Sequence, residues 1–292
     1  MFTQFKKLDA SYFDKNNLIK PYKILGLFEE VGINHNEQLD ISFKNLFLVG
    51  KTWLIARTKF DCLKPLQKNV QFAPTNVSVN LNNPIAINNF ELPCKNNERS
   101  QKVALEQEVQ DNQETTLAQE VGANKKTALE QEVELATWYH TENKACHEKD
   151  FAIYSPNGEL LIKGASKWCV FDRLQNKLCG VNCIVIPQED NKRRNYPKFF
   201  PKILAPTVNW VWRFDYSPTK DVIDVNNHIN NVMYLKILED ILPAQITHLQ
   251  IDYYQQCLLC DTLKIFSYVE DNRYYFKGEV NTEIIFTVLC QQ

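Results

Sequence analysis

The sequence predicts an α+β protein made of two similar units in tandem, each a long helix wrapped by one curved antiparallel sheet. Two observations lead to this prediction. The same order of a polar loop, a helix-like segment and several strand-like segments occurs twice along the chain. Residues 14–31 (DKNNLIKPYKILGLFEEV) also align without a gap on residues 224–241 (DVNNHINNVMYLKILEDI). A helix covered by a sheet is a stable two-layer arrangement for about 120 residues, so each half can hold one unit.

The first half shows its elements through the spacing of its apolar residues. Apolar residues recur at helical spacing over 20–34, which predicts a helix there. The turn residues SPNGE at 155–159 predict a hairpin between two strands. Runs rich in β-branched and aromatic residues predict strands in three further stretches, which are 51–63, 134–155 and 160–172.

The second half repeats this order after a linker. Residues 187–208 are rich in proline and charge, which is typical of a connecting segment. We expect a helix from about 230 to 243 and strands at 209–216, 247–256, 262–270, 273–280 and 282–290. The domains are therefore predicted at 1–186 and 209–292.

An insertion interrupts the first unit at about 72–130. Within it, LEQEV, LAQEV and LEQEV recur every 12 residues, at 105, 117 and 129. At about 100° per residue, 12 residues turn a helix by three turns and roughly 120°, so the apolar residues of successive copies point in three directions. No apolar stripe forms, and we interpret the segment as largely solvated or disordered.

The composition narrows the class of protein. Of the 292 residues, 44% are apolar and 23% charged, which is a globular balance. The formal net charge of −2 gives no general attraction to nucleic acid, and no apolar run reaches the ~20 residues of a membrane span. Nine scattered cysteines are typical of reduced thiols in a cytoplasmic protein. CGVNC (179–183) and CLLC (257–260) lack a second pair at zinc spacing, so we expect no metal.

Three stretches of the chain resemble a known family. The segment DVNNHINNVMYLKILEDILP, which begins at residue 224, resembles the D-V-N-x-H-x-N-N-x-x-Y motif of plant and bacterial acyl-ACP thioesterases. LQIDYYQQC at 249–257 is similar to the family's L-E-Y-R-R-E-C, and residues 136–172 resemble its strand-turn-strand segment. The resemblance covers about 1–70 and 134–290. It implies a tandem hotdog fold, hydrolysis of fatty acyl-[acyl carrier protein] to free fatty acid, acyl carrier protein as partner, and no cofactor.

The resemblance also assigns a polar network to the second half. It implies that Asp224, Asn226 and His228 are catalytic. His228 would serve as general base or as polariser of a water molecule, because imidazole titrates near neutral pH. Asn226 would hydrogen-bond His228 or the substrate carbonyl, and Asp224 would fix the imidazole tautomer. The position of His228 is Leu18 in the first half, and leucine cannot transfer a proton.

Two further catalytic positions follow 28 and 29 residues after the histidine. Cys257 is either a nucleophile, as in Cys/His/Asn enzymes, or a wall residue, and we favour a water activated by His228. Gln256 stands where the family has an acid. An amide cannot act as a base, although it can orient a water or a carbonyl.

The resemblance also implies that the acyl chain lies between helix and sheet of the first half, against Leu18, Ile24 and Phe28. The alternatives to an acyl-ACP hydrolase are a hydrolase of acyl-CoA or another small thioester, and an inactive acyl-binding protein. The assembly is either a monomer, in effect a pseudo-dimer of hotdogs, or a homodimer. A basic cluster in the linker is interpreted as solvated, with docking of the acidic carrier protein as the alternative; its members are Lys192, Arg193, Arg194, Lys198 and Lys202.

Overall fold

The computed structural model describes most of the chain outside the predicted insertion. The described residues are 1–68, 131–140, 146–187, 193–196, 201–204, 206–207, 209–224 and 226–292. They lie in one compact unit. The predicted insertion at about 72–130 and half of the predicted linker at 187–208 lie outside the described residues. Within the described ranges, no helix combines the length and hydropathy needed to cross a membrane.

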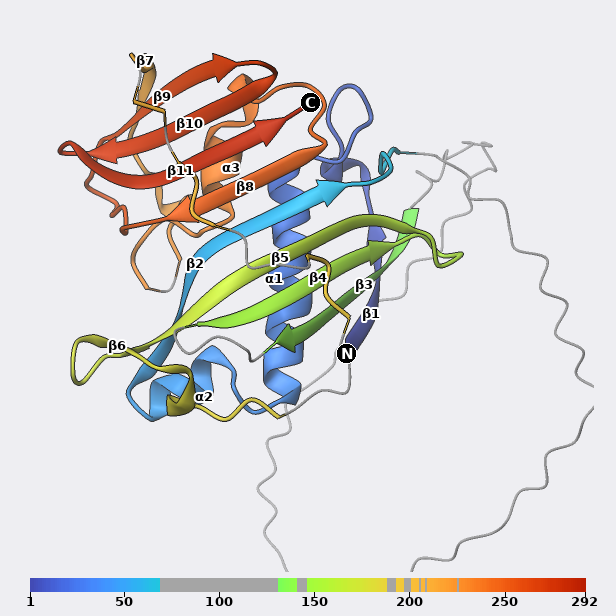
Figure 1. Ribbon diagram of the computed structural model, residues 1–292, viewed down its shortest axis with the longest axis vertical. Helices are drawn as coiled ribbons and strands as arrows, with labels where there is room; N and C mark the ends of the chain where they lie inside the picture. The colour runs from blue at the N-terminus through green and yellow to red at the C-terminus, as the bar shows by residue number, and fades with distance from the viewer. Residues whose placement is uncertain are drawn as a thin grey trace, which may run out of the picture. The chain divides into compact units, whose positions relative to one another are not determined.

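One antiparallel sheet runs through both halves (Figure 1). Its path is β1-β3-β4-β5-β2-β8-β11-β10-β9-β7, with β6 paired to β5 off this path. The strand bounds are β1 Phe2–Leu8, β2 Lys51–Cys62, β3 Gln131–His140, β4 His147–Tyr154, β5 Leu160–Asp172, β6 Lys177–Cys179, β7 Val211–Tyr216, β8 His248–Tyr253, β9 Leu263–Glu270, β10 Arg273–Val280 and β11 Glu283–Gln291. From the outer edge to the centre, the strand order is β1-β3-β4-β5-β2 in the first half and β7-β9-β10-β11-β8 in the second. The two halves therefore have the same strand order, mirrored about the centre of the sheet.

The two halves meet where β2 pairs with β8, and the register there is symmetric. Lys59 faces Gln250 at the centre of the pairing. On one side of this centre, Arg57 Nε lies 3.2 Å from Asp252 Oδ1, and on the other, His248 Nδ1 lies 2.6 Å from Asp61 Oδ1. Each half therefore contributes one basic side chain and one carboxylate to the seam, and the two pairs exchange roles across a pseudo-two-fold axis.

The first half contains the long helix that the sequence predicts. Helix α1 spans Pro21–Gln38, with a proline at its first position, where the missing N–H costs nothing. It buries its apolar face against the sheet, and the residues of that face are Ile24, Leu25, Leu27, Phe28 and Val31. A short helix, α2, follows at Phe43–Leu48, and the sequence did not predict it.

The predicted helix at 230–243 is much shorter than expected. Helix α3 spans only Met233–Ile237, and a 3-10 turn follows at Glu239–Ile241. At the start, the Asn230 side chain accepts the backbone N–H of Val232 at 2.8 Å, which competes with helix formation. At the end, Pro243 forces the preceding residue, Leu242, into an extended backbone. A regular helix therefore has room for little more than one turn.

Apart from this helix, the predicted elements agree with the fold. Strand β5 has the predicted bounds, and the hairpin before it turns at Gly158, whose φ of +81° favours glycine. The stretch predicted as strands at 134–155 forms β3 and β4. Strand β1, at the outer edge of the sheet, was missed. The predicted α+β class of two helix-and-sheet units is confirmed, with the second helix reduced to a short one.

Candidate active site

The loop that carries His228 is a closed polar turn. The Asp224 N–H donates to the carbonyl of His228 at 2.9 Å, and the Asn227 N–H donates to the carbonyl of Asp224 at 3.1 Å. Asn227 has a φ of +66°, which asparagine tolerates better than most residues. The Asp224 carboxylate accepts the backbone N–H of Asn226 at 2.8 Å. Several of the short polar side chains in this motif are therefore used to close the turn.

The first half has the same turn without the histidine. The Asp14 N–H donates to the carbonyl of Leu18 at 2.8 Å, and the Asn17 N–H donates to Asp14 O at 3.0 Å. Asn17 has a φ of +61°, and the Asp14 carboxylate accepts the Asn16 N–H at 2.8 Å. The turn is thus a property of the Asp-x-Asn-Asn sequence, and the imidazole is an addition to it.

His228 is held by two acceptors on the same side of its ring. Its Nδ1 lies 3.3 Å from the carbonyl of Ile229 and 3.5 Å from Asp224 Oδ2. Because both neighbours accept hydrogen bonds, the proton belongs on Nδ1, and Nε2 keeps its lone pair. The Asn226 amide donates to the same Asp224 carboxylate at 3.3 Å. The structure therefore brings Asp224, Asn226 and His228 together, with the aspartate between the other two.

Cys257 lies directly under this loop but is enclosed. The Ile229 N–H donates to the carbonyl of Cys257 at 2.9 Å, and the Cys257 side chain is fully buried. Burial raises the pKa of its thiol to about 12, and the negative charge of Asp261 adds to this effect. In the first half, the Ile19 N–H makes the same bond to Leu66 O at 3.1 Å. Leu66, an equally buried core residue, thus occupies the place of Cys257.

Gln256 lies at the surface. Its side chain is exposed, and within the described chain we find no hydrogen bond between that amide and the Asp224–His228 turn. The structure therefore brings Cys257 next to the predicted network through backbone pairing, and leaves Gln256 outside it.

A cavity opens beside the loop, between α1 and the sheet of the first half. Its empty volume, open side included, is about 570 Å³. Asn231, Val232 and Tyr253 line it from the second half, only a few residues from His228 or Cys257. Its first-half walls are Leu25, Phe28, Glu29, Gly32, Ile33, Asn36, Phe43, Ile55, Thr58, Lys149, Phe151, Ser166 and Trp168.

The three predicted acyl-binding residues divide between two cavities. Phe28 lines the cavity beside the His228 loop. Leu18 and Ile24 line a second cavity, which lies at the first-half loop and is bordered by residues 239–247. The two cavities correspond under the pseudo-two-fold relation, since Glu29 of one matches Glu239 of the other.

Glu29 is a residue of this site that the sequence did not single out. Its Oε1 accepts the side-chain N–H of Asn230 at 3.4 Å. Burial raises the pKa of the Glu29 carboxyl, the Asn230 bond opposes the rise, and the charge of Asp224 adds to it. The repeat alignment pairs Glu29 with Glu239, but only the fold reveals that α1 presents this carboxyl to the loop of the other half.

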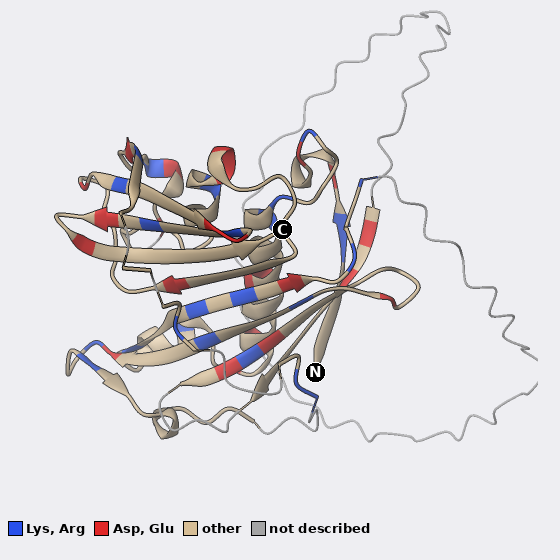
Figure 2. Cartoon of the chain, turned by 45° about the horizontal axis from the view of Figure 1, so that its top comes forward, with Lys and Arg blue, Asp and Glu red and all other residues tan. Residues whose placement is uncertain are grey.

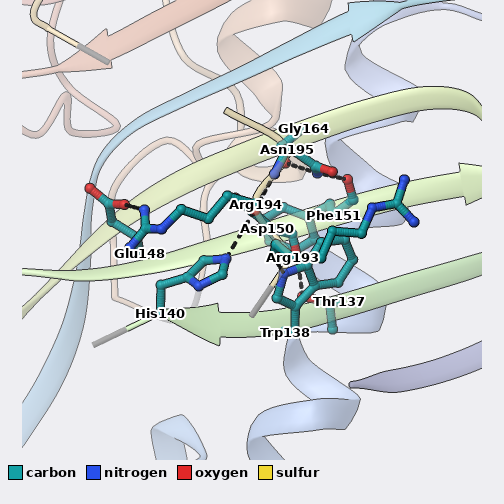
Figure 3. A network of polar contacts seen from close by, with 10 residues as sticks. All are labelled: Thr137, Trp138, His140, Glu148, Asp150, Phe151, Gly164, Arg193, Arg194 and Asn195. Carbon is teal, nitrogen blue, oxygen red and sulfur yellow. Dashed lines mark hydrogen bonds and ion pairs between the residues drawn. The ribbon is translucent and has the colours of Figure 1, made fainter. Parts of the chain in front are cut away.

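The described part of the linker binds the outer face of the first-half sheet (Figure 3). Asn195 donates its side-chain N–H groups to the carbonyls of Phe151 and Gly164, at 2.6 and 2.8 Å. Its backbone N–H donates to Asp150, which also lies 3.0 Å from His140 Nε2. Asp150 and His140 are buried, so this network fastens the linker to the sheet.

Two arginines of the basic cluster in this linker bind side chains of the same sheet. Arg194 Nη1 lies 2.8 Å from Glu148 Oε2, and Arg193 Nη1 donates to the Tyr154 hydroxyl at 3.2 Å. Lys202 lies over the ring of Tyr254, and the other two lysines of the cluster, at 192 and 198, lie outside the described residues. Further lysines and arginines lie on the central strands themselves (Figure 2).

Part of the second half is similar to a known protein family. Residues 213–285 match the family model of the acyl-ACP thioesterase C-terminal domain. Oleoyl-acyl carrier protein thioesterase 1, chloroplastic, from Arabidopsis thaliana is 25% identical over 147 residues, which are 43% of this chain and 39% of that protein. The corresponding enzyme of Coriandrum sativum is also 25% identical, over 43% of this chain and 38% of its own. The chain thus spans about two fifths of the length of these relatives.

Solved structures share the whole fold at low sequence identity. An acyl-ACP thioesterase from Bacteroides thetaiotaomicron has a TM-score of 0.65 at 12% identity, covering 99% of this chain and 96% of its own. A putative oleoyl thioesterase from Lactobacillus plantarum has 0.67 at 13%, covering 99% and 94%. The 12:0-ACP thioesterase from Umbellularia californica has 0.65 at 11%, covering 99% and 96%. The predicted tandem hotdog fold and the resemblance to acyl-ACP thioesterases are therefore confirmed.

Proposed function

We propose that this protein hydrolyses the thioester between a fatty acyl group and acyl carrier protein and releases the free fatty acid. The observation that carries the proposal is the Asp224–His228 pair, set in a turn that opens beside an apolar cavity. The equivalent turn of the first half has Leu18 at the same place, so the chemistry belongs to one site per chain. The match of residues 213–285 to the thioesterase family supports the same reaction.

His228 activates the attacking water in this mechanism. Asp224 and the carbonyl of Ile229 hold the proton on Nδ1, so Nε2 accepts a proton from water as the water oxygen bonds to the carbonyl carbon. The bond between carbon and sulfur then breaks, and the imidazolium gives its proton to the departing thiolate. Asn226 keeps the Asp224 carboxylate turned toward the ring through one amide N–H, and its other N–H is free to face the carbonyl oxygen.

Cys257 is a wall residue in this proposal. A thiol whose pKa is raised to about 12 is almost wholly protonated at neutral pH, and the thiolate is the nucleophilic form. Its counterpart Leu66 fills the same place with hydrocarbon. Both facts favour packing over covalent catalysis, and they leave water as the nucleophile.

The acyl chain occupies the cavity between α1 and the first-half sheet. Phe28, Phe151 and Trp168 give it apolar walls. The thioester then lies at the cavity mouth, where Asn231 and Tyr253 border the His228 loop.

Turnover on two carriers tests the proposal. The purified full chain is offered the same fatty acyl group on acyl carrier protein and on coenzyme A, and release of free thiol is measured. We expect a higher kcat/KM on the carrier protein. Faster hydrolysis of the coenzyme A thioester would replace the proposed substrate by a small thioester. Binding of acyl groups without release of thiol from either carrier would show that the chain is not a hydrolase.

A further inference from the structure

Helix α1 of the first half extends a carboxyl group to the catalytic loop of the second half. Glu29 accepts a hydrogen bond from Asn230, two residues beyond His228, and it lines the cavity beside Asn231 and Tyr253. Helix α1 and α3 pack against each other, so this contact is part of the joint between the halves. A site assembled from both halves can therefore use side chains that the second half does not itself contain.

The pseudo-symmetric position shows what is unusual about Glu29. Its counterpart Glu239 lies 3.4 Å from the ammonium of Lys20, and Lys20 is the counterpart of Asn230. The glutamate at the inactive mouth thus has a cation as neighbour, whereas the glutamate at the His228 mouth has a neutral amide. An ammonium stabilises a carboxylate more strongly than an amide does, so the Glu29 carboxylate receives less stabilisation from this neighbour than the Glu239 carboxylate does.

The surroundings of Glu29 adjust this carboxyl for proton chemistry. Burial is the main reason that its pKa lies above the ordinary value for glutamate, and the negative charge of Asp224 on the loop acts in the same direction. The Asn230 bond acts against them. From strand β8, Tyr253 also faces Glu29, and its hydroxyl donates to the carbonyl of Asn231 at 3.2 Å. A carboxylate of raised pKa is a better hydrogen-bond acceptor for a reacting water than an ordinary one.

We propose that Glu29 is a catalytic carboxylate of this site and supplies, from the first half, the acid that position 256 lacks. The inference rests on the proposed thioester hydrolysis. One hydrogen of the attacking water is directed to His228 Nε2 and the other to the Glu29 carboxylate, which leaves a lone pair aimed at the carbonyl carbon. The first proton passes to His228 and then to the thiolate. Glu29 takes up no proton overall, but it must be ionised for the reaction to proceed.

The pH dependence of kcat/KM on a fatty acyl-ACP tests this role. Each group that must be deprotonated adds about one to the limiting slope of the acidic limb of the logarithmic profile, so Glu29 adds about one to the slope that His228 and the Asp224 carboxylate produce. We expect Glu29→Gln to lower kcat by about 10²-fold or more and to reduce this slope by about one. Glu29→Asp keeps the carboxylate and should recover part of the rate and the steeper slope.

Glu239→Gln is the matched control, because it makes the same change at the inactive mouth. We expect its rate to stay within about three-fold of the parent rate and its slope to stay at the parent value. A slope of about one in the parent, an active Glu29→Gln, or equal losses in both glutamate variants would each overturn the role of Glu29. If Glu29→Gln does not fold, the rate of Glu29→Asp decides the question, and a folded Glu29→Asp as inactive as His228→Ala would overturn the role.

Failure of this inference differs from failure of the proposed function. A parent protein that releases no thiol from any acyl thioester contradicts the hydrolase itself. An active Glu29→Gln beside an inactive His228→Ala contradicts only the contribution of Glu29.

Discussion

The turns at 14–18 and 224–228 have the same backbone and differ in their chemistry. Each has an aspartate that accepts the N–H two residues later, an asparagine with positive φ, and a following isoleucine whose N–H donates to a buried residue of a neighbouring segment. Only the second has an imidazole next to the carboxylate. The comparison teaches that the polar loop is a structural device that forms with or without an imidazole, and that only the second half places one beside the aspartate.

The helices that follow these two turns differ in length. Helix α1 has 18 residues and α3 has five. Gly32 of α1 lines the cavity beside the His228 loop, where a Cβ would lie at ordinary van der Waals distance from Phe151 and Lys149. We infer a division of labour in which one half holds the acyl chain and the other performs the chemistry.

The largest expected effect comes from making the second turn like the first. We predict that His228→Leu lowers thioester hydrolysis by about 10²–10⁴-fold, the usual contribution of a positioned general base. The melting temperature should change little, because Leu18 shows that the turn closes around a leucine. Assays of thiol release and thermal unfolding on the same preparation check both parts. Activity within a few-fold of the parent would mean that the asymmetry between the turns has no catalytic meaning.

Most of the fold could be predicted from the sequence, because the spacing of apolar residues within a segment indicates whether that segment forms a strand or a helix. Strand β5 and helix α1 follow from their own residues, whereas α3 was over-extended, since a regular pattern over 230–243 conceals the competition from Asn230 and Pro243. Asp224, Asn226 and His228 could be found because they lie within five residues. Glu29 could not, because its contact with Asn230 spans 201 positions and depends on the joint between the halves.

Removing the carboxylate of each turn should sharpen the comparison. We predict that Asp224→Asn lowers kcat by at least about 10-fold, because an amide can present its N–H to His228 Nδ1 and so favour the wrong tautomer. Asp14→Asn should leave kcat unchanged and reduce the free energy of unfolding by about 0.5–1 kcal/mol, through the weaker acceptor for the Asn16 and Leu18 N–H groups. Kinetics and urea denaturation of both variants separate the two roles. Equal losses of kcat would show that both turns serve catalysis.

The Asp61–His248 and Asp252–Arg57 pairs, where β2 meets β8, are expected to differ in how much they stabilise the fold. Burial raises the pKa of Asp61, but the hydrogen bond and charge of His248, with the charge of Lys163, outweigh burial and leave the pKa lowered. Such a carboxylate stabilises the fold above its unfolded pKa, and this contribution is lost as pH falls below about 4. We predict that His248→Ala costs about 0.5–1 kcal/mol at pH 7 and flattens the acid loss of stability.

Arg57→Ala removes the cation of the other pair at the seam, whose carboxylate, Asp252, is almost wholly buried. We expect this variant to lose about 1–3 kcal/mol in free energy of unfolding, more than His248→Ala, since a buried carboxylate is left without its cation. Urea denaturation at pH 7 and pH 3 measures both variants. A larger effect of His248→Ala would show that the two pseudo-symmetric pairs are not ordered by burial.

The smallest effect on turnover is expected under the loop, where Cys257 and Leu66 are equivalent. We predict that Cys257→Ala retains hydrolysis within a few-fold, because water is the nucleophile of the proposed mechanism and the buried thiol, with its raised pKa, is protonated. Rapid quench and mass spectrometry of the parent should then detect no acyl group on the peptide that contains Cys257. Leu66→Ala should cost about 2–5 kcal/mol of stability, more than Cys257→Ala, because it removes a larger buried side chain. An inactive but folded Cys257→Ala, with an acyl adduct on the parent peptide, would instead make the cysteine the nucleophile, and the two positions would then share only their place in the fold.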